Sequence, residues 1–335
     1  KSDVYWRDQD TLWVATDFGE GSLTTSGYAR ITKRWSRGTP LADAATVLEV
    51  PESHVGVKAY SDHTPDGRYD LVMDIPEFFR GAHYLVLDGR KVRLDLPADV
   101  SMKGMFKDQL LVLLRTDWTV AGITYPQGAL LAIDLDDFLQ GERAFDTLFE
   151  PSERVSLDTI ATTRNRLVLT TLDNVRGRLY VMEFDGGEWS RHEVPTPGLG
   201  SVEIESTSYD DDTWFFSYTD FLTPSTLFLV EEDLEPAAVK SSPAFFDASG
   251  MEVAQHEATS KDGTSIPYFV VTPKGFEANG TAPTVLYGYG GFEIPMLPKY
   301  SDKSGTAWLA RGGVWVLSNI RGGGEFGPRW HQGVL

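Results

Sequence analysis

Cysteine is absent from this sequence of 335 residues. Its absence excludes disulfide bonds, a cysteine nucleophile and thiolate metal sites. The sequence has only six histidines, and no two of them have the spacing of paired metal ligands: His54, His63, His83, His192, His256 and His331. We therefore expect no metal site.

Long apolar runs are also absent. No stretch of about 18 apolar residues occurs, so we expect no transmembrane helix and no membrane partner. Positive charge is scarce, with 30 Lys and Arg against 49 Asp and Glu and a net charge of −19. Nucleic-acid binders present basic patches, and the one dense basic cluster, at residues 30–37, is typical of a solvated strand or turn. We expect no nucleic-acid partner.

The first residues are KSDVYWRDQD, without an initiating Met, a signal peptide or a transit peptide. We interpret them as the continuation of a longer chain. We expect a cytoplasmic protein, with the periplasm as the alternative. Hydrophobic residues make up 41% of the sequence and aromatic residues 12%, which is typical of a globular protein with a substantial core. The length suits one large domain or two ordinary ones.

Short strands and polar turns dominate residues 1 to about 245, and they recur at an irregular period. Five apolar or alternating runs, each after a polar turn, begin 41 to 58 residues apart: Thr11–Thr16, Tyr69–Ile75, Leu110–Leu114, Leu167–Thr171 and Trp214–Tyr218. Propeller blades typically span about 40 to 50 residues. The recurrence predicts a β-propeller of about five blades and favours it over a large β-sandwich.

Three of these units contain a further strand that ends in an acidic residue, at 81–88, 128–134 and 177–183. We interpret these strands as outer strands of the blades. One short helix is predicted at Asp136–Arg143, as a turn at the edge of a blade. Asp134, Asp136 and Asp137 resemble the start of a calcium loop, but its glycine and terminal glutamate do not follow, so we interpret them as turn-capping residues.

The pattern changes at about residues 243–258. Residues 257–273 alternate around Lys261-Asp262-Gly263, which predicts an antiparallel hairpin. Thr284–Tyr287 and Val314–Ile320 are apolar runs typical of buried parallel strands. Each ends in a glycine cluster, where glycine permits positive φ or a close approach to the backbone. Ligands of open α/β sheets bind at the carboxyl ends of such strands, so we expect one edge of an active site there.

The second cluster also satisfies the pattern G-x-G-x-x-G over residues 322–327, which is found in dinucleotide-binding loops. An acidic partner for ribose would lie about 20 residues further on. The sequence ends before that position, so the match covers six residues only. We expect no nucleotide and no other cofactor.

Two long motifs in this region carry a resemblance to a known family: YGYGGF at 287–292 and NIRGGGEFG at 319–327, followed by Trp330-His331. Together with DGTSIPYFVVTPKG at 262–275, they resemble the prolyl oligopeptidase family of serine peptidases. The resemblance implies a β-propeller that caps an α/β-hydrolase domain. The family has seven blades, so about two would precede residue 1. The predicted organisation is a partial propeller at 1–245 and a truncated α/β-hydrolase domain at 246–335.

The resemblance also implies roles for residues of the first glycine loop. Tyr289 matches the family tyrosine whose hydroxyl donates to the oxyanion, and the adjacent Gly290 and Gly291 would let it point into a cleft. Phe292 matches the aromatic residue that lines the pocket for the residue before the scissile bond, and a proline ring stacks well on an aromatic face. In the second loop, we interpret Arg321 and Glu325 as supporting residues that form a buried ion pair.

The catalytic triad is missing from the sequence. No G-x-S-x-G elbow is present, so the serine, its acid and its histidine are expected outside these residues. We expect the segment alone to be inactive and to need the rest of the same protein. The resemblance implies hydrolysis of short peptides after proline, with access controlled by the propeller. Cleavage after basic residues, which the negative charge would suit, and a non-catalytic propeller used as a binding platform are the alternatives.

Overall fold

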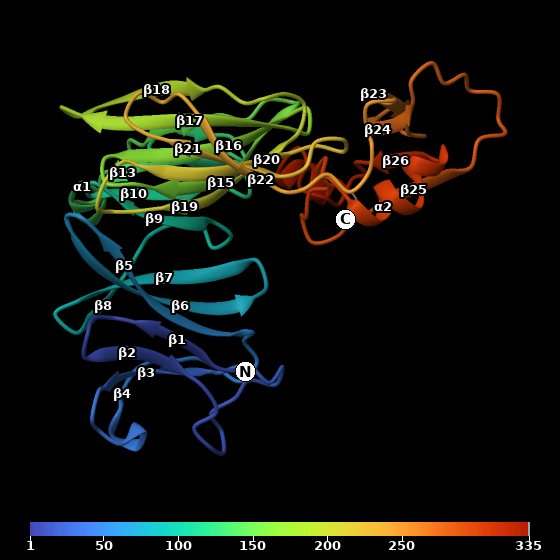
Figure 1. The fold of residues 1–335 in the computed structure, drawn as a ribbon. Coiled ribbons are helices and arrows are strands. Elements are labelled where there is room, and N and C mark those ends of the chain that lie inside the picture. The colour runs from blue at the N-terminus through green and yellow to red at the C-terminus, as the bar shows by residue number, and fades with distance from the viewer. Residues whose placement is uncertain (334–335) are drawn as a thin grey trace. The chain divides into compact units, whose positions relative to one another are not determined.

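The computed structural model describes residues 1–333, and these form two compact units. The first comprises residues 1–125 and 130–147, and the second comprises residues 126–129 and the chain from 148 on. Each unit is built mainly from four-stranded sheets (Figure 1). None of the described helices is long and apolar enough to cross a membrane.

The first unit contains three four-stranded sheets and one small two-stranded sheet. Their strands are β1 (Asp3–Trp6), β2 (Thr11–Ala15), β3 (Ile31–Ser36) and β4 (Ala45–Glu49); β5 (Gly56–Thr64), β6 (Gly67–Glu77), β7 (Arg80–Leu87) and β8 (Arg90–Arg93); β9 (Ser101–Phe106), β10 (Gln109–Leu113), β13 (Leu130–Asp134) and β14 (Asp146–Phe149); and β11 (Trp118–Val120) with β12 (Ile123–Tyr125). A 3-10 turn, η1, covers Leu41–Asp43. Each four-stranded sheet follows the order of its strands along the chain.

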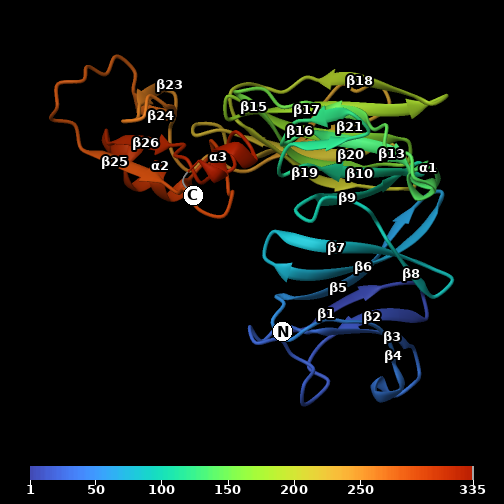
Figure 2. The same ribbon diagram turned by 180° about the vertical axis from the view of Figure 1, so that it is seen from behind.

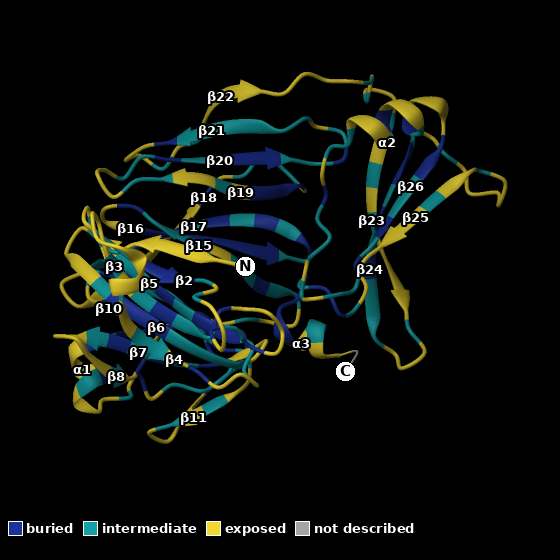
Figure 3. Cartoon of the chain, turned by 90° about the horizontal axis from the view of Figure 1, so that it is seen from below, coloured by how far each residue is buried: buried dark blue, intermediate teal, exposed yellow. Residues whose placement is uncertain are grey.

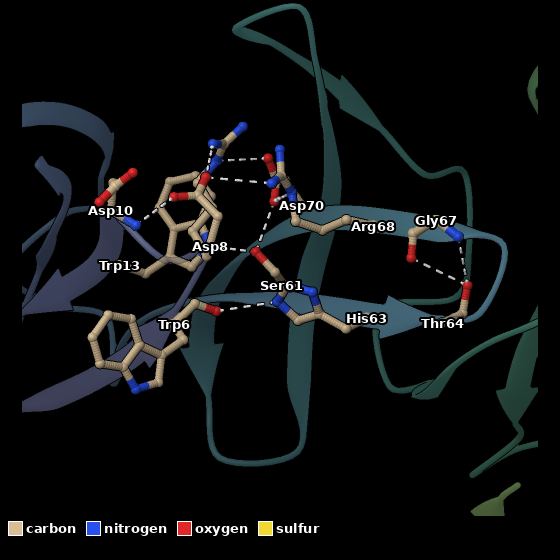
Figure 4. Close-up of polar contacts among 11 residues, drawn as sticks. Trp6, Asp8, Asp10, Trp13, Ser61, His63, Thr64, Gly67, Arg68 and Asp70 are labelled. Atoms are coloured by element: carbon tan, nitrogen blue, oxygen red, sulfur yellow. Dashed lines mark hydrogen bonds and ion pairs between the residues drawn. The ribbon is translucent and has the colours of Figure 1, made fainter. Parts of the chain in front are cut away.

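An ion-pair network joins the first two sheets of this unit (Figure 4). Arg7, in the β1–β2 turn, donates from Nε to Oδ2 of Asp70 in β6 at 2.9 Å. The other carboxylate oxygen of Asp70 accepts from Ser61 at 2.7 Å and pairs with Arg68 at 3.1 Å. Asp70 is buried, so these partners satisfy a carboxylate that would otherwise destabilise the fold.

The second unit begins with two further four-stranded sheets. Their strands are β15 (Val155–Thr162), β16 (Arg166–Asp173), β17 (Arg176–Asp185) and β18 (Glu188–Val194), followed by β19 (Ser201–Thr207), β20 (Trp214–Thr219), β21 (Thr226–Val230) and β22 (Ala237–Ser241). Residues 1–241 therefore contain five four-stranded sheets, which agrees with the predicted number of repeats.

The five apolar runs in the sequence coincide with the second strand of each sheet, namely β2, β6, β10, β16 and β20. The interpretation of 81–88, 128–134 and 177–183 as outer strands is wrong, because they correspond to the third strands β7, β13 and β17. The apolar residues in these segments are explained by burial, because a central strand has neighbouring strands on both sides. By contrast, the edge strand β22 is exposed at every residue (Figure 3).

A shared apolar core joins the two sheets of the second unit. Trp214 and Phe216 of β20 are 0% exposed and pack with Val168 of β16 and Leu179 of β17. The rings of Trp214 and Phe216 lie 5.7 Å apart. Face-to-face packing of successive sheets is the arrangement expected of neighbouring propeller blades.

The predicted short helix is present as α1 (Leu135–Gln140), between β13 and β14. Asp134 precedes it, and its side chain accepts from the backbone N–H groups of Asp136 and Asp137 at 2.9 and 3.1 Å. This is the geometry of an N-cap residue. The interpretation as a capping residue is therefore confirmed for Asp134, whereas Asp136 and Asp137 take part through their backbone N–H groups.

The last sheet has the order β23–β24–β26–β25 and differs from the others in containing a parallel pair (Figure 2). Its strands are β23 (Met251–Thr259), β24 (Ser265–Pro273), β25 (Thr284–Gly288) and β26 (Val314–Ser318). α2 (Asp302–Ala307) and η2 (Leu309–Arg311) lie between β25 and β26, and α3 (Pro328–Gln332) follows β26. β23 and β24 form the predicted hairpin, and β25 and β26 are parallel.

The expectation that Thr284–Tyr287 is a buried strand is wrong. Leu286, in β25, is 70% exposed and Tyr287 is 46% exposed. Among the described residues β25 pairs with β26 only, so it lies at the edge of the sheet. An apolar run indicates a strand but does not indicate how many neighbours cover it.

Candidate functional site

The two glycine loops meet at one edge of the last sheet. β25 and β26 pair in register from Thr284 opposite Val314 to Gly288 opposite Ser318, so both loops leave from the same end of the pair. Their backbones pack closely. A Cβ atom on Gly290 would lie 2.5 Å from the carbonyl oxygen of Arg321. Only glycine permits this approach, as the sequence predicted for the loop.

Tyr289 is a partly exposed residue of the first loop. The residue is 38% exposed, and its hydroxyl forms no hydrogen bond within residues 1–333. The ring lies against Gly291, where an added Cβ would be 3.1 Å from the phenol oxygen. The environment is therefore not that of a core tyrosine, and the O–H is free to donate to a ligand.

Phe292 is also exposed, at 68%, and its backbone is unusual. Phe292 and Glu293 have φ values of +55° and +59°, in the left-handed region. Each such non-glycine residue costs about 1–3 kcal/mol and persists only where the surrounding structure enforces it. The Phe292 side chain therefore lies on the surface of a strained loop and not in the core.

Arg321 does not form the predicted ion pair with Glu325, and that prediction is wrong. Its guanidinium instead contacts the β23–β24 hairpin, pairing with Asp262 and donating to Ser260 at 3.2 Å. The backbone N–H of Thr264, followed by Arg321, holds the pKa of Asp262 below its usual range. Arg321 thus ties the second glycine loop to a hairpin turn about 60 residues earlier in the sequence.

Glu325 is 0% exposed and has no cationic partner in the part of the chain that is described. Its Oε1 accepts from the backbone N–H of Met296 at 2.9 Å and from Nδ2 of Asn319 at 3.3 Å. Its Oε2 has no hydrogen-bond partner among residues 1–333. Burial raises the pKa of the Glu325 carboxyl, against the hydrogen bonds from Met296 and Asn319, which lower it.

Asn319 is a site residue that sequence reasoning missed. It follows β26, is 0% exposed, and donates to the carbonyl oxygen of Met296 at 2.6 Å. The sequence could have identified Asn319, because its side-chain amide directly follows an apolar strand. Polar residues at that end of a strand are candidates for ligand contacts in α/β sheets.

Serines at the start of two blade-like sheets hold both loops in place. Ser156 of β15 donates to the carbonyl of Glu325 at 3.1 Å. Ser201 of β19 donates to the carbonyl of Pro298 at 2.8 Å. The loops are therefore positioned by the preceding sheets of the same unit as well as by β25 and β26.

A cavity of about 290 Å³ lies beside the site. It is mostly apolar and is lined by Phe221, Tyr287, Met296, Leu297, Leu309, Trp315 and Leu317, with Lys299, Ser301 and Ser304. Neither Tyr289 nor Phe292 lines it, so it is distinct from the surface that these two residues form. Within residues 1–333, no group of three or more His, Asp or Glu side chains could hold a metal ion.

The raised pKa of Glu325 predicts a pH-dependent difference from the Glu325→Gln variant. In the unfolded chain this carboxyl ionises near 4.5, whereas the folded chain keeps its proton to higher pH. As pH rises above about 4.5 the unfolded state binds fewer protons than the folded state, so this group lowers the free energy of unfolding. We expect Glu325→Gln to gain stability relative to the unmodified chain as pH rises above about 4.5. Thermal unfolding of the two proteins over a pH series measures this difference, and a stability difference that does not change with pH would contradict the prediction.

Comparisons with known proteins identify the same family as the sequence motifs do. A family model described as "Prolyl oligopeptidase, N-terminal beta-propeller domain" matches residues 1–240. The uncharacterized peptidase y4nA of Sinorhizobium fredii is 38% identical over all of this chain and 48% of its own length. A prolyl endopeptidase of Elizabethkingia miricola is 35% identical over 42% of this chain and 20% of its own length.

Among solved structures, a post-proline cleaving enzyme from Rickettsia typhi is similar to 99% of the chain, with a TM-score of 0.93 and 28% identity. The match covers 50% of that enzyme. The chain therefore spans about half the length of y4nA and of the Rickettsia typhi enzyme.

Proposed function

The chain belongs to the prolyl oligopeptidase family, and from that premise we propose that it is part of a serine peptidase that cleaves short peptides after proline. Residues 1–245 supply about five of seven propeller blades, and residues 246–335 supply the first strands of an α/β-hydrolase domain. The serine, acid and histidine of the triad lie in another part of the same protein. The propeller restricts entry to short peptides.

The observation that carries this proposal is the exposed pair Tyr289 and Phe292 on a strained loop at the carboxyl end of β25. In acyl transfer, negative charge develops on the carbonyl oxygen of the substrate, and a hydroxyl such as that of Tyr289 stabilises it by donating a hydrogen bond. Phe292 offers an aromatic face on which a proline ring can stack. Gly290 allows this loop to lie against the second loop, and Gly291 leaves room for the Tyr289 ring. Arg321 and Glu325 support the loops.

The alternative specificity, cleavage after a basic residue, is favoured by one observation, the net charge of −19. A cationic substrate would be attracted by such a charge at long range. Phe292 supports proline instead, because an apolar ring provides no carboxylate for a basic side chain. Two fluorogenic peptides that differ only in proline or arginine before the scissile bond separate these alternatives.

The proposal is tested by labelling with a fluorophosphonate, which reacts with activated serines. We expect the 335-residue chain to remain unlabelled and inactive, and the intact protein to be labelled and to prefer the proline peptide. A label on the 335-residue chain would show a nucleophile within it and overturn the assignment of the triad. An intact protein without label or hydrolysis would favour a propeller that acts as a binding platform.

A further inference from the structure

The segment from Phe292 to Pro298 depends on partners outside itself. Pro295 and Pro298 lack a backbone N–H, and the segment belongs to no helix or strand. Its one local bond runs from the N–H of Ile294 to the carbonyl three residues earlier, at 3.1 Å. The remaining polar groups must bond to neighbouring elements or to water.

Met296 lies in the middle of this segment, and both of its backbone groups are bound. Its N–H donates to Oε1 of Glu325 at 2.9 Å, and its C=O accepts from Nδ2 of Asn319 at 2.6 Å. Asn319 and Glu325 are both 0% exposed, so water does not compete for these bonds. A buried polar group that loses its hydrogen-bond partner destabilises the fold. Movement of Met296 away from Asn319 and Glu325 would break both bonds, so these residues favour one position of the Met296 backbone.

Asn319 and Glu325 are themselves attached to rigid parts of the unit. The backbone N–H of Asn319 donates to the carbonyl of Pro267 in β24 at 3.0 Å. The carbonyl of Glu325 accepts from Ser156 of β15. The position of the segment is therefore set by two sheets and not by the loop alone.

We propose that Asn319 and Glu325 are positioning residues that hold the Phe292 loop in the geometry required to select the substrate residue before the scissile bond. They act through Met296, four residues after Phe292, and do not touch the substrate. The inference rests on the proposed function only for the role of Phe292. The hydrogen bonds to Met296 stand independently of it.

Two variants of Glu325 form a matched pair for testing this inference. Glu325→Gln keeps an oxygen acceptor for the Met296 N–H, whereas Glu325→Met keeps a similar length and removes the acceptor. Asn319→Leu is a separate variant that removes the donor to the Met296 carbonyl and leaves Glu325 in place. Glu325→Gln is therefore the conservative control.

Hydrogen exchange of the Met296 amide in the intact protein is the first measurement. We expect this amide to be protected in the unmodified chain and in Glu325→Gln, and to exchange about tenfold faster or more in Glu325→Met. Exchange at the rate of an unstructured amide in the unmodified chain would overturn the inference, even if the variants fail to fold. Equal exchange in all folded variants would overturn it as well.

Selectivity of the intact peptidase is the second measurement. We expect Glu325→Met and Asn319→Leu to reduce kcat/KM for a proline peptide by about ten- to a hundredfold, and for the matching alanine peptide by less. Fluorophosphonate labelling should remain, because the nucleophile is elsewhere. An unchanged ratio of proline to alanine hydrolysis would overturn the positioning role. If the unmodified enzyme shows no preference for proline, the proposed specificity fails, whereas the exchange result still tests the contact with Met296.

Discussion

We expect the Tyr289→Phe variant of the intact peptidase to lose about 10²–10³-fold in kcat, with little change in KM. Tyr289 is 38% exposed and its hydroxyl forms no hydrogen bond within residues 1–333, so removal of the hydroxyl leaves no partner group unsatisfied. The oxyanion exists in the transition state and not in the bound substrate, so the loss falls on kcat. It corresponds to about 2.7–4 kcal/mol of transition-state stabilisation. Steady-state kinetics with a proline peptide measure both constants.

Tyr287→Phe is the matched control for this experiment. Tyr287 is 46% exposed, lies two residues earlier on β25, and stacks on Trp315 with ring centroids 6.2 Å apart. The Tyr287→Phe variant also loses one phenol oxygen, at a position close to Tyr289 in the sequence. We expect its kcat and KM to remain within about twofold of the unmodified enzyme, because surface substitutions usually have small effects. Equal losses in both variants, or a Tyr289→Phe enzyme with near-normal kcat, would contradict an oxyanion role for Tyr289.

Replacement of Trp214 with alanine should give the largest loss of stability, about 3–5 kcal/mol. The Trp214 side chain is 0% exposed and packs between the β15–β18 sheet and the β19–β22 sheet. Its removal leaves a cavity lined by residues of both sheets, which can close only if the sheets shift. Denaturant unfolding measures the change as a lower midpoint with an unchanged slope.

Two further variants separate packing from other effects at this position. Trp214→Phe should cost less than Trp214→Ala, because it keeps an aromatic ring and removes an indole N–H that has no partner among residues 1–333. Val239→Ala, on the exposed β22 strand, should change stability by no more than about 0.5 kcal/mol. A Trp214→Ala change below about 1 kcal/mol would show that the two sheets do not share a cooperative core.

The local sequence was sufficient for several features. The apolar runs at 11–16, 69–75, 110–114, 167–171 and 214–218 identified one central strand in each of the five sheets, because a strand covered on both sides needs apolar residues on both faces. The Asp134 cap and the β23–β24 hairpin were also predictable, because their hydrogen bonds join residues close in sequence. The motifs around Tyr289 and Arg321 identified the family.

Other features depended on partners distant in the sequence, which periodicity does not specify. Arg321 was expected to pair with Glu325, four residues away, but it pairs with Asp262 because the hairpin turn lies beside its loop. Asn319 became recognisable as a site residue only when Met296 was found within hydrogen-bond distance. The exposure of β25 likewise depended on its place in the sheet and not on its composition.

The sequence by itself therefore determined the repeat, one central strand of each sheet, the capped helix and the two glycine loops, because each results from local backbone preference or from the spacing of apolar residues. The tertiary structure decided which strands lie at sheet edges, which acid pairs with Arg321, and how Glu325 and Asn319 hold Met296. These outcomes depend on burial and on contacts between residues far apart in the chain, and a buried polar group selects its partner only after the surrounding elements have packed.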